Sequence, residues 1–79
     1  MYQDWTKEDV AYWLENTIKL KQHVNTFLNL EVNGSWFDIP IDAETLEEDF
    51  GIKIKIHRKI ILKGIELVKK SQEQPQEQQ

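Results

Sequence analysis

Apolar residues early in the chain recur three and four positions apart, which is the spacing of one face of an α-helix. The first such series is Val10, Trp13, Leu14 and Ile18. Thr6 stands before this series, and Asp9 follows Thr6 by three residues, so the pair resembles a capping box with Asp in place of Glu or Gln. These signals predict a first helix from Lys7 to about Asn16.

A second series predicts a helix that ends near Asn29, and its members are Leu20, Val24, Phe27 and Leu28. Asn33-Gly34 then marks a turn, because this dipeptide is a strong turn signal. We expect a very short helix from Ser35 to Phe37 that places Trp36 or Phe37 in the core.

The next helix has polar residues at most positions. Asp42 is a suitable N-cap for a helix from Ala43 to about Asp49. Leu46 and then Phe50 are its expected inward anchors. Gly51 follows, and a left-handed glycine is a common end to a helix.

The segment Ile52-Lys53-Ile54-Lys55-Ile56 alternates as a strand would. No second convincing strand exists to pair with it, and a lone strand would leave its backbone groups without partners. We therefore expect an extended connector and then the longest helix of the fold, from about Ile56 to Ser71. Its predicted inward stripe is Ile56, Ile60, Ile61, Gly64, Ile65 and Val68.

A chain of 79 residues has room for one small domain, which buries only ~60% of its unfolded surface. The core area must come from aromatic residues, namely Trp5, Trp13, Phe27, Trp36, Phe37 and Phe50. The segment from Ser71 to Gln79 contains no apolar residue. We therefore expect an all-α domain over residues 1–70 and a disordered Gln/Glu-rich tail or linker over residues 71–79.

Charged residues are sorted along the chain. From Glu31 to Asp49 every ionised side chain is acidic, whereas from Lys53 to Lys70 the cations are interrupted by Glu66 alone. The formal net charge is −4, so the basic excess is local. The folded domain is expected to carry one acidic and one basic face, which lets one copy dock onto the next.

The residue content does not support catalysis. Cys is absent, and His23 and His57 have no carboxylate at motif spacing, so neither a metal site nor a catalytic triad is indicated. The chain also contains no nucleophile–base set and no phosphate loop. We expect no enzyme activity, no cofactor, no metal and no small-molecule substrate.

The same composition bears on location. The absence of Cys is consistent with a reducing intracellular compartment. The first residues lack the basic start and apolar run of a signal peptide, and no apolar stretch approaches the ~20 residues of a membrane span. We expect an intracellular, cytoplasmic protein without a transmembrane segment.

Three segments resemble a known family. Trp5-Thr6-Lys7-Glu8-Asp9-Val10, followed by Trp13-Leu14, is similar to the opening of sterile alpha motif (SAM) domains. Glu31-Val32-Asn33-Gly34 resembles their mid-domain turn, and Gly51-Ile52-Lys53 with His57-Arg58 and Ile61-Leu62 resembles the start of their last helix. The resemblance covers roughly residues 4 to 70. It implies a small five-helix bundle that acts as an interaction module, in a signalling or scaffold protein.

The resemblance also implies two docking surfaces. SAM domains recurrently join a mid-loop surface on one domain to a surface at the start of the last helix on another. The end-helix face of this chain would be Lys53, Lys55, Ile56, His57, Arg58 and Lys59. The mid-loop face would be Trp36, Asp38, Asp42, Glu44, Glu47, Glu48 and Asp49.

Two departures from the family pattern affect these faces. Ile56 stands where SAM domains commonly have glycine, so it either packs inward or forms an exposed apolar knob. Asp38 and Pro40 stand where apolar residues are common in the family, which affects the shape of the middle surface. Buried anchors supply most of the affinity of such contacts, and Ile56 and Trp36 are the candidates.

The sequence thus predicts head-to-tail self-association or pairing with another SAM domain, because contact between two different faces is heterologous. The alternative is RNA-hairpin binding through Lys55, Arg58, Lys59 and Lys63. The acidic total and the lack of a stacking aromatic beside this patch argue against nucleic acid as the main partner. The same basic patch leaves a lipid surface open as a third kind of partner.

Overall fold

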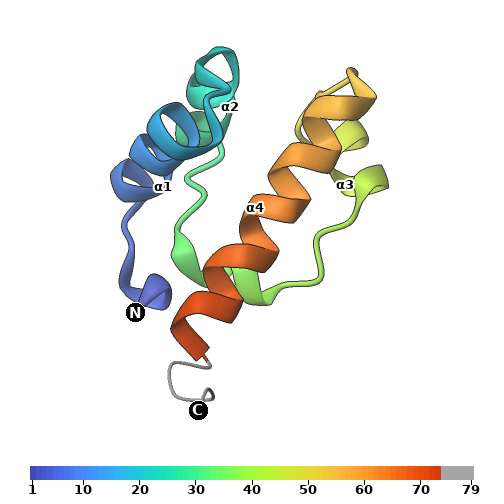
Figure 1. Ribbon diagram of the computed structural model, residues 1–79. Helices are drawn as coiled ribbons and strands as arrows, with labels where there is room; N and C mark the ends of the chain where they lie inside the picture. Colours follow the sequence, from blue (N-terminus) through green and yellow to red (C-terminus); the bar gives the residue numbers. More distant parts are fainter. Residues whose placement is uncertain (74–79) are drawn as a thin grey trace.

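The longest helix, α4 (Lys55–Glu73), runs across the whole molecule, and the rest of the chain lies on either side of it (Figure 1). The computed structural model describes residues 1–73. Within that range the chain forms no strand, and the other elements are η1 (Tyr2–Asp4), α1 (Lys7–Trp13), η2 (Leu14–Ile18), η3 (Lys21–His23), α2 (Val24–Asn29), η4 (Gly34–Asp38) and α3 (Ala43–Glu48). η2 continues α1 and η3 leads into α2, so the predicted all-α bundle of five helical segments with a long last helix is confirmed.

The first helix begins as the sequence predicts. The Thr6 side chain accepts a hydrogen bond from the Asp9 N–H at 3.1 Å, and the Asp9 carboxylate accepts one from the Thr6 N–H at 3.0 Å. These two bonds complete a capping box. The helix continues past Asn16 as the π turn η2 and ends at Lys19, which has the left-handed φ of 66°.

Two of the central helices also begin at side-chain caps, of which the sequence predicted Asp42 but not Asn33. Asn33 accepts a hydrogen bond from the Ser35 N–H at 3.0 Å, and Asp42 accepts one from the Thr45 N–H at 2.9 Å. These bonds satisfy backbone donors that have no partner within the first turn. Gly51 ends this region with a φ of 70°, so the predicted left-handed glycine is confirmed.

The alternating isoleucines do not form a strand. Ile52 is buried, whereas Ile54 and Ile56 are 54% and 56% exposed. Residues 52–54 form a connector without helix or strand, as the sequence predicts, and Lys55 and Ile56 already belong to the first turn of α4.

The predicted boundary at residue 70 falls inside α4, because the helix continues through Glu73. Gln and Glu are good helix formers, and the Gln72 side chain accepts a hydrogen bond from the Tyr2 N–H. The first three residues of the predicted tail are therefore helical. The remainder of that tail, residues 74–79, lies outside the described residues.

The core is built around aromatic rings from distant parts of the sequence. Trp13 packs against Phe37 with ring centroids 5.1 Å apart, and Trp5 meets the same ring edge-on at 6.0 Å. Tyr2, at the start of the chain, stacks on Phe37, and the Tyr2 side chain is fully buried. Four of the six predicted core aromatics are buried, while Trp5 and Trp36 are half-buried against the core.

The predicted inward stripe of α4 is wrong at its first members. Ile61 and Ile65 are buried, but Ile56 and Ile60 are 56% and 37% exposed. Residues that precede Ile61 by three and four positions share its face of the helix. Those residues are Arg58 and His57, which are half-buried, so Ile56 is turned outward.

Gly34 provides a direct test of this packing. A methyl group on its Cα would overlap the carbonyl oxygen of Tyr2, and backbone cannot rotate out of the way. Gly34→Ala is expected to destabilise the domain by about 3 kcal/mol, the upper end of the usual overpacking range. The melting temperature followed by circular dichroism would fall by roughly 12–24 °C.

Gly51→Asn is the matched control, because Gly51 has open space around its Cα and Asn tolerates a left-handed φ. The control should lose much less stability than Gly34→Ala. Equal melting temperatures for the two variants would contradict the packing at Gly34.

Candidate protein-interaction surfaces

The predicted end-helix face is gathered around the start of α4. Lys53, Lys55, Ile56 and Lys59 are exposed, and His57 and Arg58 are half-buried. The first turn of α4 contains no acidic residue, although the positive end of the helix dipole favours acids there. Lys55 and Lys59 therefore add positive charge to a helix end that is already positive, and the face is suited to an anionic partner.

Arg58 differs from the lysines, because its guanidinium is used inside the domain. One Nη donates to the carbonyl oxygen of Ile52 at 2.9 Å and to that of Lys53 at 3.0 Å. Its Nε is buried and has no acceptor within residues 1–73. Arg58 fixes the connector that precedes α4, so it is a positioning residue for this face and not a free docking charge.

The exposed apolar atoms of the face come from two residues. Ile56 projects from the first turn of α4. Of the two alternatives, inward packing or an exposed apolar knob, the structure shows the exposed knob. Ile54 is 54% exposed beside it and was missed by the sequence analysis. Its exposure could have been expected from its place in the connector, because alternation with Ile52 indicates a shared buried face only in a strand.

The predicted mid-loop face is divided between free and engaged carboxylates. Asp38 accepts hydrogen bonds from the Tyr2 hydroxyl and from the Gln3 amide, so its carboxylate joins η4 to the start of the chain. Asp42 caps α3, and the backbone N–H of Thr45 holds the pKa of the Asp42 carboxyl below its ordinary value. The free carboxylates are exposed on α3 and just after it: Glu44, Glu47, Glu48 and Asp49.

An apolar pocket of about 270 Å³ lies beside these carboxylates. Trp36 lines it and packs edge-on against Phe50, with ring centroids 6.2 Å apart. Leu30 and Ile39 also line it and are 38% and 54% exposed. The sequence indicated Trp36 as part of this surface. It did not indicate Leu30 or Ile39, because neither lies in a polar pattern that marks a docking surface.

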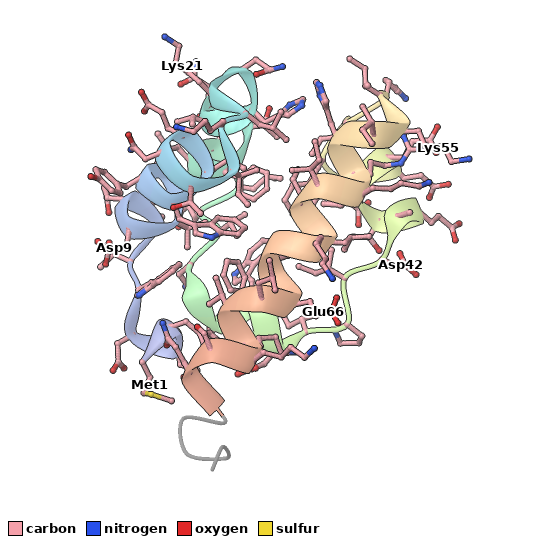
Figure 2. The ribbon with its side chains drawn as sticks, in the orientation of Figure 1. Met1, Asp9, Lys21, Asp42, Lys55 and Glu66 are labelled. Atoms are coloured by element: carbon pink, nitrogen blue, oxygen red, sulfur yellow. The ribbon has the colours of Figure 1, made fainter. Side chains whose placement is uncertain are left out.

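The two faces lie on neighbouring helices. α3 packs against α4, and Figure 2 shows Asp42 and Lys55 on the same side of α4. Within residues 1–73 the ion pairs join Lys63 to Glu66 at 3.9 Å and the amino terminus to Asp4 at 3.8 Å. Neither links the acidic face to the basic face, so within residues 1–73 the two faces do not neutralise each other through an ion pair.

The two histidines meet, which the sequence did not indicate. His23 Nε2 lies 3.0 Å from His57 Nδ1, and the rings contact edge to face. Burial, and then repulsion by His57, hold the pKa of His23 below its ordinary value of 6.5. The described part of the chain places no third His, Cys, Asp or Glu with them in a group that could hold a metal.

Comparison with known proteins agrees with the fold. The family model of the SAM domain (sterile alpha motif) matches residues 3–69, so the chain belongs to this family. No curated protein matches the chain. Membership indicates a protein-interaction module, a class that is generally not enzymatic. Among the described residues, no helix is both long enough and apolar enough to cross a membrane.

Arg58→Ala tests the positioning role of the guanidinium. Two backbone carbonyls lose a charged donor, so we expect a loss of about 1.5–3 kcal/mol in the free energy of unfolding, measured with urea. Lys59→Ala is the matched control, and as an exposed substitution it should stay within about 0.5 kcal/mol. Equal unfolding midpoints for both variants would rule out the role.

The histidine pair predicts a pH dependence of stability. Because the pKa of His23 is lowered by folding, the unfolded chain binds more protons just below pH 6.5. This contribution to stability is therefore complete above pH 6.5 and is lost as the pH falls through the lowered pKa. Urea midpoints at about pH 7.5 and about pH 5 would measure the loss.

His23→Gln is the control for that measurement, because Gln does not titrate. It should show a smaller difference between the two pH values than the wild type. An undiminished difference in His23→Gln would assign the effect to other groups.

Proposed function

We propose that this domain mediates association between SAM domains, of its own kind or with another protein. The end-helix face of one domain docks on the mid-loop face of the next. The observation that carries this proposal is that the two faces have opposite charges and that no ion pair within residues 1–73 neutralises one with the other. Opposite charges on the two faces set the relative orientation of the two domains and speed their encounter.

Affinity is assigned to the apolar groups at the centre of each face. Ile54 and Ile56 project from the basic face, and the pocket lined by Trp36 and Ile39 is hollowed into the acidic face. A single isoleucine side chain that enters such a pocket leaves water and gains ~1.5–3 kcal/mol. Trp36 thus serves as part of the receiving pocket, while Ile56 is the inserting anchor.

The symmetry of the assembly follows from which faces meet. Contact between two different faces is heterologous, and repetition builds a ring or an open filament. Because α3 and α4 are neighbours, a two-fold pair that makes both contacts at once is the closed alternative. Growth of mass with concentration indicates the first arrangement, and a mass that stops at two indicates the second.

RNA binding is the second candidate, and one observation favours it. Lys55, Lys59 and Lys63 are exposed and stand four residues apart, so they form one row on α4. Against it, α4 contains no Phe, Tyr or Trp on which a base can stack. The association of SAM domains is therefore preferred, in a signalling or scaffold protein of the cytoplasm.

Sedimentation velocity at low salt tests the association. The wild type is expected to gain mass with concentration and to lose that gain as salt is added. Lys55→Glu/Lys59→Glu reverses two charges of the basic face, and Glu44→Gln/Glu47→Gln neutralises two of the four free carboxylates of the acidic face, so each variant should associate much less than the wild type. A mixture of the two variants keeps one working pair of faces and should form a complex that stops at two.

Lys19→Glu/Lys21→Glu is the matched control, because it makes the same charge change at exposed lysines outside both faces. It should associate like the wild type. A wild type that stays monomeric at high concentration and low salt excludes self-association and leaves a different SAM domain as the partner. A gel shift of hairpin RNA that Lys55→Glu/Lys59→Glu abolishes would favour the RNA candidate instead.

A further inference from the structure

A second concave surface lies between η2 and α4, away from the pocket of the mid-loop face. It is an apolar groove of about 650 Å³. Trp13 and Ile18 line one side of it, and α4 forms the other side with Ile60, Gly64 and Leu67. Neither face of the proposed SAM association includes these five residues.

Gly64 accounts for the shape of the groove. A methyl group on its Cα would overlap Ile18 Cδ1 and would lie 3.0 Å from Trp13 Cζ2. The two elements therefore approach closely at Gly64, which gives the groove its floor. Leu67 is 52% exposed and Ile60 is 37% exposed, so apolar surface remains open to solvent along α4.

The charges lining the groove are of one sign. Lys59 and Lys63 are exposed and line it, and no Asp or Glu among the described residues does. Within the described residues the ion-pair partner of Lys63 is the exposed Glu66, at 3.9 Å, and an ion pair of this kind is weak. The lining along α4 extends from Lys59 to Ser71, which at 1.5 Å per residue is roughly 18 Å, or three helical turns.

We propose that this groove binds an acidic amphipathic helix of a partner protein. The apolar face of that helix lies over Trp13, Ile60 and Leu67, and its carboxylates meet Lys59 and Lys63. This is the helix-in-groove mode of recognition, in which apolar anchors recur at helical spacing. Because the groove lies outside the mid-loop pocket, a domain can bind this helix while that pocket is occupied by another SAM domain.

Residues 74–79 and the helices α3 and α4 of a second copy do not supply a suitable occupant. Residues 74–79 contain only Gln and Glu besides Pro75, so their sequence offers no apolar face. The α4 helix of a second copy would bring lysines against Lys59 and Lys63. The acidic helix α3 has a single large apolar residue, Leu46, and that residue is buried in its own core. A bilayer is a broad surface, whereas the open apolar atoms here line a concavity between η2 and α4.

The probe is a designed helical peptide of about five turns, with Leu at helical spacing and Glu on the flanking positions. Its binding is followed by amide chemical shifts of the ¹⁵N-labelled domain. The Trp13 indole N–H is a built-in reporter, because it is buried in the groove lining without an acceptor among residues 1–73. We expect saturable shifts at that indole, at Thr17 and at Gly64.

Leu67→Asp should weaken binding of the peptide by at least ~10-fold, which is the loss expected for one buried leucine. Ile39→Asp is the matched control, since Ile39 is 54% exposed on the mid-loop side, and it should leave the affinity unchanged. Lys63→Glu should weaken binding several-fold and reduce its salt dependence.

Four results would each overturn the proposal. Two of them concern the peptide: no chemical-shift change at the groove up to about 1 mM peptide, or equal binding of a peptide that has Lys in place of Glu. The other two concern a different occupant: shift changes at the groove that only phosphatidylserine vesicles produce, or that only a higher concentration of the domain produces. The wild type and Ile39→Asp are compared at a concentration where both are monomeric. The outcome is therefore independent of whether SAM association occurs.

Discussion

The rotational setting of α4 is the constraint on which the rest of the structure depends. Ile61 and Ile65 are buried, and Gly64 allows the helix to approach η2 more closely than a side chain would permit. Once these three residues face inward, every other residue of α4 has its direction fixed by the helical period. α4 also contacts η1 and α3, so one helix orients both the start of the chain and the acidic segment.

That setting explains which residues at the start of α4 are available to a partner. Arg58 and His57 share the inward face, where Arg58 binds the connector and His57 meets His23. Ile56 and Lys59 are left outside. The burial of polar groups here is a consequence of helix geometry, and it leaves an apolar knob beside uncompensated lysines.

The charges of this small domain serve two different purposes. Asp38, Asp42 and Arg58 bind groups of the domain itself, so they hold segments together and are less free to attract a partner. The lysines at the start of α4 and the carboxylates of α3 have no such bonds within the described residues. Lys59 belongs both to the basic face and to the lining of the groove, so the charges of partners bound at the two sites would interact there.

The sequence by itself determined the main helices, the caps at Thr6 and Asp42 and the sorting of charge, because these depend on residues within a few positions of one another. Thr6 with Asp9, Asp42 and Gly51 are local signals, and each has the predicted role. Only the tertiary structure decided that Tyr2 is core, that His23 meets His57 and that Ile56 is exposed. Those outcomes depend on how α4 is rotated against distant segments, and no spacing along the chain encodes that angle.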